Sequence, residues 1–251
     1  MTASLPFSIL LPALKASGEN KTLISEVENL HEKKEYEKEY QLMLPYKAST
    51  DADILWRLAR ASTDIGKTKG DNSEERKTKI YEAFGYATRA LELDDKNFAC
   101  HKWYGILLDY TAEYEGNKAR ISNAFKVKEH FEKAIELNPQ DATTMHCLGV
   151  WCFLFADMPW YTRKIAAAIF ASPPTSTYEE AMKFFQLAEN TEPGFYSKNK
   201  VMLGKTAMRL GDRGAAKEFL LDALRYVDKT VDDQTARKEA QDLLKELGVK
   251  L

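Results

Sequence analysis

The feature that most constrains the fold of this chain is a spacing of small and bulky residues that recurs, in whole or in part, four times. A small residue is followed four positions later by a second, usually bulkier one, and three positions after that by another small one. The four copies are Ala83-x3-Ala87-x2-Ala90, Phe131-x2-Ala134, Ala181-x3-Phe185-x2-Ala188 and Ala216-x3-Leu220-x2-Ala223. Small side chains let helices approach closely and a bulky one fills the space between them. The spacing is typical of the second helix of a tetratricopeptide repeat.

A matching first-helix pattern precedes each copy. Its pair of a large residue and glycine appears as Tyr104-Gly105, Leu148-Gly149 and Leu203-Gly204, with residues 56–60 as a degenerate earlier copy. We expect each glycine at the crossing of two paired helices, where a side chain would force them apart. Asp95, Pro139 and Pro193 mark the helix ends, because proline lacks the N–H that a helix interior needs. The chain is therefore predicted to be an all-α, tetratricopeptide-repeat-like superhelix of helical hairpins.

The repeats are longer than the ideal period of about 34 residues, so we expect inserts between the paired helices. Residues 67–75 are polar and are predicted to form a solvated loop, and residues 115–121 form the second insert. Residues 160–170, followed by Pro173-Pro174, are predicted to form a short amphipathic helix that packs back on the stack.

Both ends of the repeat array have their own expected helices. Residues 232–247 carry alanine and leucine on one face and charged residues on the other, as a C-terminal capping helix requires. Residues 22–44 are predicted to form two helices at the other end. We expect a single domain over residues 21–251 and a flexible N-terminal segment over residues 1–20.

Composition excludes several classes of function. The formal charge of -2 and the pI of about 6.2 argue against a nucleic-acid-binding protein, which needs a basic face. The apolar run at residues 5–14 is too short to cross a bilayer and contains two prolines, so we expect no transmembrane segment. Cys100, Cys147 and Cys152 lack metal-site spacing and are predicted to be reduced thiols. No catalytic motif is present, and we expect no enzyme activity, cofactor or metal.

Several strings resemble the regulator of microtubule dynamics family, and the resemblance runs from about residue 35 to residue 247. They are LWRLARA at 55–61, KEHFEKAIEL at 128–137, RKIAAA at 163–168, TYEEA at 177–181 and PGFYSKN at 193–199. The resemblance implies a tetratricopeptide-like fold, association with microtubules and spindles in the cytoplasm, and no catalytic residues. Some members carry an N-terminal membrane anchor and are linked to lipid binding.

The first helices of such a superhelix line its concave face. Helical periodicity counted from each glycine places a set of basic residues there, interleaved with Ile106, Val150 and Val201, and acidic residues are expected to be scarce. The predicted groove residues are Arg57, Lys102, His146, Lys198 and Lys205. Arg120, Arg163 and Lys164, in the inserts, either extend this basic surface or cap helix ends. The alternative for the whole set is an ordinary solvated helix surface.

Three functions remain open at this stage. The first is a non-catalytic module that associates with microtubules and binds an acidic segment, such as a tubulin tail, in its groove. The second is a lipid-binding or lipid-transfer module that holds a phospholipid in the same groove. The third is a clamp for the C-termini of partner proteins.

Overall fold

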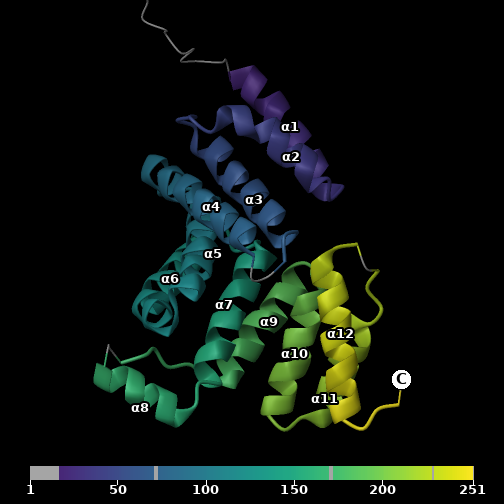
Figure 1. Cartoon of the computed structure of the whole chain (residues 1–251). Coiled ribbons are helices and arrows are strands. Elements are labelled where there is room, and N and C mark those ends of the chain that lie inside the picture. Colours follow the sequence, from purple (N-terminus) through teal and green to yellow (C-terminus); the bar gives the residue numbers. More distant parts are fainter. Residues whose placement is uncertain (1–16, 71–72, 170–171, 228, 251) are drawn as a thin grey trace, which may run out of the picture.

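The computed structural model describes residues 17–70, 73–169, 172–227 and 229–250, and these residues form helices joined by turns and short loops (Figure 1). Within the described residues, four helix pairs build the stack. The paired helices are α3 (Ala52–Lys67) with α4 (Glu74–Leu93), α5 (Phe98–Glu115) with α6 (Asn117–Leu137), α7 (Ala142–Ala156) with α9 (Tyr178–Thr191), and α10 (Ser197–Arg209) with α11 (Arg213–Ala223). The predicted all-α superhelix of helical hairpins is confirmed.

The crossing glycines lie where the sequence places them. A methyl group added to Gly105 would come within 2.8 Å of the Phe131 ring, and one added to Gly149 within 2.7 Å of the Phe185 ring. At Gly204 the same addition would meet the side chain of Leu220 at 2.6 Å. Each glycine of a first helix therefore faces the bulky residue of the second-helix pattern, and both halves of the repeat meet at one contact.

The ends of the second helices also agree with the sequence. Helix α6 ends one residue before Asn138-Pro139, and α9 ends shortly before Pro193. Helix α9 begins with a capping box: the Thr177 side chain accepts from the Glu180 N–H, and the Glu180 side chain accepts from the Thr177 N–H. These reciprocal bonds satisfy two backbone donors that the first turn would otherwise leave unpaired.

Additional helices cover both ends of the stack. Helix α1 (Ser17–Glu32), α2 (Tyr36–Met43) and the short 3₁₀ helix η1 (Leu44–Tyr46) precede α3, with Val27 and Met43 buried. Helix α12 (Val231–Glu246) follows α11 and buries the apolar face that the sequence predicts. We expected a flexible segment over residues 1–20. Residues 1–16 lie outside the described residues, and residues 17–20 belong to α1.

The core consists of clusters that follow one another along the stack. One cluster joins α1 and α2 to α3, a second joins α3, α4 and α5, the largest runs from α5 to α10, and another joins α10 and α11 to α12. Each helix pair is thus stabilised mainly by its neighbours, as expected for a solenoid.

The extra residues of the second repeat extend a helix instead of forming an insert. Helix α5 continues to Glu115 and α6 begins at Asn117, so that Gly116 alone separates them. Gly116 has φ of 91°, a left-handed conformation that glycine adopts without steric cost. The chain reverses at this one residue, and the added length becomes the first turns of α6.

The third insert forms a helix, α8 (Trp160–Ile169), but the prediction that it packs back on the stack is wrong. Figure 1 shows α8 projecting from the lower end of the stack. Trp160 is 70% exposed, Tyr161 and Ile165 are exposed as well, and Ala166 is buried. Trp56, Trp103 and Trp151, which belong to the paired helices, are buried, unlike Trp160.

Candidate partner-binding surface

The first helices share an accessible face that points away from the crossing glycines. Its members lie at similar angles from the glycine around their helices, about 60° to 160° at 100° per residue. They are Lys102, Ile106 and Tyr110 on α5, Cys147, Val150 and Leu154 on α7, and Lys198, Met202 and Lys205 on α10. We call this surface the inner wall. Basic residues lie on α5 and α10, and the α7 stripe between them is apolar.

The inner wall curves far enough to bring distant parts of the chain together. Nζ of Lys67, in the last turn of α3, lies 3.8 Å from Oδ2 of Asp232 in the first turn of α12. The hydroxyl of Tyr196 donates to the same Oδ2 at 2.9 Å. Although burial raises the pKa of Asp232, Lys67 and then Lys198 lower it, and it stays below its usual value. Asp232 is therefore an anion at neutral pH between two lysines.

The lysines of α10 form a ladder with α12. Lys198 donates to Asp232 at 2.6 Å, and Lys205 donates to Glu239 at 2.7 Å. Both partners are seven residues apart on their helices, about two turns, so the two bonds lie one above the other. The side chains of Lys198 and Lys205 are 34% and 31% exposed, which keeps both cations accessible to a ligand.

The other two predicted cations are less accessible. Lys102 donates to Oδ1 of Asp141, the N-cap of α7, at 2.8 Å. Arg57 donates to Glu28 at 2.7 Å and to Asp53 at 3.2 Å. The side chains of Lys102 and Arg57 are each 13% exposed. Lys102 thus joins α5 to the start of α7, and Arg57 joins α3 to α1.

Two expectations about this surface are wrong. Acidic residues are not scarce, because Asp141, Asp232 and Glu239 each pair with a predicted groove lysine. These carboxylates come from the start of α7 and from α12, each two helices further along the chain, which the periodicity of a single helix does not reveal. Val201 is 1% exposed and packs against α11 and α12 instead of lining the wall.

His146 lies behind the inner wall and not on it. Its Nδ1 is 2.9 Å from Oδ1 of Asn199, and its ring packs against Phe185 and Tyr196. Burial lowers the pKa of His146 to about 4, so the imidazole is neutral at pH 7. It contributes no positive charge to the wall.

The accessory basic residues have separate places. Arg163 donates to the carbonyl oxygens of Phe155 at 2.6 Å and Pro174 at 2.7 Å, and so caps the end of α7 and holds α8. Lys164 lies over the exposed ring of Trp160 at 5.1 Å. Arg120, at the start of α6, lowers the pKa of Asp109, which burial raises by more.

The inner wall offers no activated nucleophile at Cys147. Burial raises the pKa of this thiol to about 12, so it is protonated at neutral pH and reacts poorly. The three cysteines are free, as predicted. Within the described residues, no helix combines the length and the hydropathy needed to cross a bilayer.

The paired helices and the inner wall define the class of protein. A crystal structure of a tetratricopeptide-repeat protein from Thermus thermophilus aligns with 89% of this chain and 98% of its own, with a TM-score of 0.62. Only 14% of the aligned residues are identical, so this likeness shows the fold alone. The chain is a tetratricopeptide-like helical solenoid.

Sequence comparisons place the chain within this class. The model of the family described as regulator of microtubule dynamics protein 1-3 matches residues 23–248. Regulator of microtubule dynamics protein 1 of Mus musculus is 48% identical over 229 residues, which are 91% of this chain and 75% of that protein. Regulator of microtubule dynamics protein 3 of Rattus norvegicus is 35% identical and covers 98% of this chain and 53% of its own length. The chain belongs to the regulator of microtubule dynamics family.

Proposed function

We propose that this chain is a non-catalytic interaction module that associates with microtubules in the cytoplasm and binds an acidic protein segment on its inner wall. The family supports the microtubule association, because its members are named as regulators of microtubule dynamics. The observation that carries the binding mode is the ladder of Lys198 and Lys205, whose ammonium groups stay accessible beside the apolar α7 stripe.

An acidic ligand would bind by exchanging ion pairs. Lys198 and Lys205 would leave Asp232 and Glu239 and contact carboxylates of the ligand, while Lys67 would remain near Asp232. An exposed ion pair contributes about 0.2–1 kcal/mol, so the exchange costs little and several contacts must act together. Arg57 and Lys102 would keep their partners and hold the helices in register, and His146 would position Asn199.

Co-sedimentation with microtubules tests this mode. We expect Lys198→Glu combined with Lys205→Glu to weaken binding by about tenfold, because each change replaces an attraction with a repulsion of similar size. Raising the ionic strength from about 0.05 M to 0.15 M should weaken binding of the wild type, since screening lengths shorten. A matched control is Lys128→Glu with Lys133→Glu on α6, which makes the same charge change away from the wall.

A second variant separates direct contact from structural damage. Asp232→Asn with Glu239→Gln removes the competing carboxylates while Lys198 and Lys205 remain. If the lysines contact the ligand, this variant should bind microtubules a few-fold more tightly than the wild type. Equal binding by the wild type and the lysine double variant would refute the role of the ladder.

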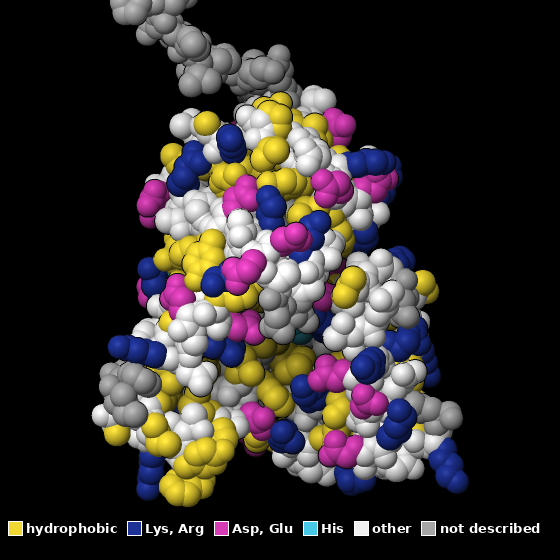
Figure 2. All heavy atoms as spheres, viewed as in Figure 1, with side chains coloured by type: hydrophobic (Ala, Val, Ile, Leu, Met, Phe, Trp, Pro, Cys, Tyr) yellow, Lys and Arg dark blue, Asp and Glu magenta, His cyan; other side chains and the backbone are white. Residues whose placement is uncertain are grey.

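The alternative is a lipid-binding module that uses the same wall. Figure 2 shows a hollow over α7, α9 and α10 with hydrophobic side chains in it, and Leu154 on α7 is exposed. A phospholipid would place its acyl chains along the α7 stripe and its phosphate near Lys205. Native mass spectrometry should then detect lipid on the wild type and not on Leu154→Asp. An empty wild-type protein after incubation with liposomes would exclude this alternative.

A further inference from the structure

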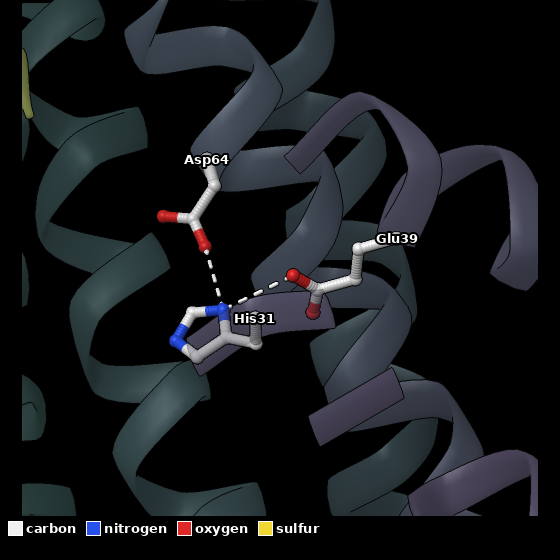
Figure 3. Close-up of side chains that lie close together, drawn as sticks. All are labelled: His31, Glu39 and Asp64. Carbon is white, nitrogen blue, oxygen red and sulfur yellow. Dashed lines mark hydrogen bonds and ion pairs between the residues drawn. The ribbon is translucent and has the colours of Figure 1, made fainter. Parts of the chain in front are cut away.

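One imidazole nitrogen and two carboxylate oxygens converge where the first three helices meet. Nδ1 of His31 on α1 lies 3.1 Å from Oε2 of Glu39 on α2 and 3.5 Å from Oδ2 of Asp64 on α3 (Figure 3). All three atoms lie within 4.8 Å of one another. The three residues come from separate helices, so their convergence is a property of the packing.

Glu39 is held in place by an arginine that contacts the other side of its carboxylate. Arg60 donates to Oε1 through Nε at 3.1 Å and through Nη2 at 2.9 Å, and its Nη1 donates to Glu28 at 2.8 Å. Glu39 is fully buried. The bonds to Oε1 leave Oε2 directed at His31, and they fix the orientation of the carboxylate as a second layer of ligands does around a metal.

Asp64 carries an unsatisfied oxygen into the same space. The residue is 9% exposed, and its Oδ2 accepts no hydrogen bond from any described residue. The nearest lysine, Lys67, approaches the other oxygen, Oδ1, at 4.0 Å. A buried carboxylate oxygen without a hydrogen-bond donor is stabilised by an additional cation.

Hydrogen bonding alone does not complete the cluster. Nδ1 of His31 carries at most one proton and can donate it well to one acceptor. Glu39 at 3.1 Å is the better placed acceptor, and the 3.5 Å to Asp64 is beyond the usual length of an N–H···O bond. Oδ2 of Asp64 is therefore left without a donor, although it faces the same nitrogen.

The distances match a metal coordination sphere. Zinc binds imidazole nitrogen and carboxylate oxygen at about 2.0–2.2 Å, which places neighbouring ligands of a tetrahedron about 3.3–3.5 Å apart. The separation of 3.5 Å between His31 Nδ1 and Asp64 Oδ2 equals this edge length, and the 3.1 Å between His31 Nδ1 and Glu39 Oε2 is slightly shorter. The two carboxylate oxygens lie within 4.8 Å of each other, so a small shift of either side chain would complete the sphere. We propose that His31, Glu39 and Asp64 bind one divalent transition-metal ion of the zinc class through Nδ1, Oε2 and Oδ2.

The ligand chemistry selects the class of ion. An imidazole nitrogen favours zinc and related transition metals over Mg²⁺ and Ca²⁺, which prefer oxygen ligands alone. The side chain of His31 is 27% exposed, so a water molecule can take the fourth position and the ion can reach the site from solvent. The bound ion would hold α1 and α2 against α3. It would fix the N-terminal end of the stack.

Zinc titration of the purified full chain, stripped with a chelator, tests the site. We expect one Zn²⁺ per chain, and about tenfold or greater loss of affinity in Asp64→Asn and in His31→Gln. Asp64→Asn keeps the shape of the side chain and removes a buried charge, so the variant should fold. The matched control is His130→Gln, because Nδ1 of His130 lies 2.9 Å from Nδ1 of His101, where two ring nitrogens could also bind zinc.

Thermal unfolding gives a second readout. Zn²⁺ should raise the melting temperature of the wild type and of His130→Gln, because a ligand that binds the folded state stabilises it. It should not raise that of Asp64→Asn, and Mg²⁺ should have no effect on any of the three. The proposal is overturned if the wild type binds no Zn²⁺, or if binding survives in Asp64→Asn and is lost in His130→Gln.

Discussion

A crossing glycine controls the distance between two helices through one contact. At Gly149 the opposing group is the Phe185 ring, which is fully buried in the largest core cluster. The same relation holds for Gly105 with Phe131 and for Gly204 with Leu220. The residue pair, rather than the glycine alone, is therefore the unit that sets the geometry of a repeat.

Gly149→Ala tests this relation. The added methyl group would overlap the Phe185 ring, and overpacking of this kind costs about 1–3 kcal/mol. We expect the free energy of unfolding to fall by that amount, measured by urea denaturation with far-UV circular dichroism. Gly85→Ala is the control, since Gly85 lies exposed in α4 with no atom within 4 Å of an added methyl. It should gain about 0.5–1 kcal/mol from the better helix former. Equal stability of Gly149→Ala and the wild type would show that the Phe185 ring moves to make room for the methyl group.

At the scale of elements, the sequence predicts the positions of the helices along the chain well. It predicts less well which residues of other helices contact them. The small–bulky–small spacing predicts the helix pairs because its bulky residue contacts the glycine of the first helix in the same pair. The same reasoning missed the carboxylate partners of Lys102 and Lys198, since Asp141 and Asp232 come from helices placed by the superhelical twist. The cluster of His31, Glu39 and Asp64 could not be predicted from the sequence, because no recognisable spacing connects the three residues.

Helix α8 shows that an amphipathic pattern predicts a helix but not what its apolar face contacts. Its aromatic and aliphatic residues indicate one apolar face, and the sequence does not say whether the stack or a partner covers that face. In the structure Trp160 and Tyr161 are exposed, and the two hydrogen bonds of Arg163 hold the helix at its base. We therefore expect the orientation of α8 to depend on that side chain more than on its apolar residues.

Arg163→Met should therefore loosen α8 without unfolding the stack. We expect faster hydrogen exchange over residues 160–169, while the melting temperature changes little because α8 contributes few buried residues. Lys164→Met serves as the matched control, since Lys164 lies exposed over the Trp160 ring. Unchanged exchange in Arg163→Met would assign the position of α8 to its other contacts.

At the scale of the whole molecule, the described residues form a chain of neighbouring contacts, and an ion pair also crosses the concave side. Core clusters join each helix pair to the next, and the Lys67–Asp232 pair connects α3 with α12. That pair is partly exposed and its atoms are 3.8 Å apart, so it contributes about 0–1 kcal/mol. A loss of stability at one end should therefore have little effect on the other end, because each repeat of a solenoid is stabilised by contacts with its nearest neighbours.

Cavities placed at opposite ends would measure this coupling. Leu244 in α12 and Val27 in α1 are both fully buried, and Leu244→Ala alone should cost about 2–5 kcal/mol at its own end. We expect Leu244→Ala to lose hydrogen-exchange protection in α10, α11 and α12 while α3 and α4 keep theirs. Val27→Ala should show the reverse, with protection lost in α1, α2 and α3. Similar losses along the entire chain in both variants would mean that the stack unfolds as one unit. Either the Lys67–Asp232 pair or the continuous core would then couple the two ends more strongly than contacts between neighbouring helices do.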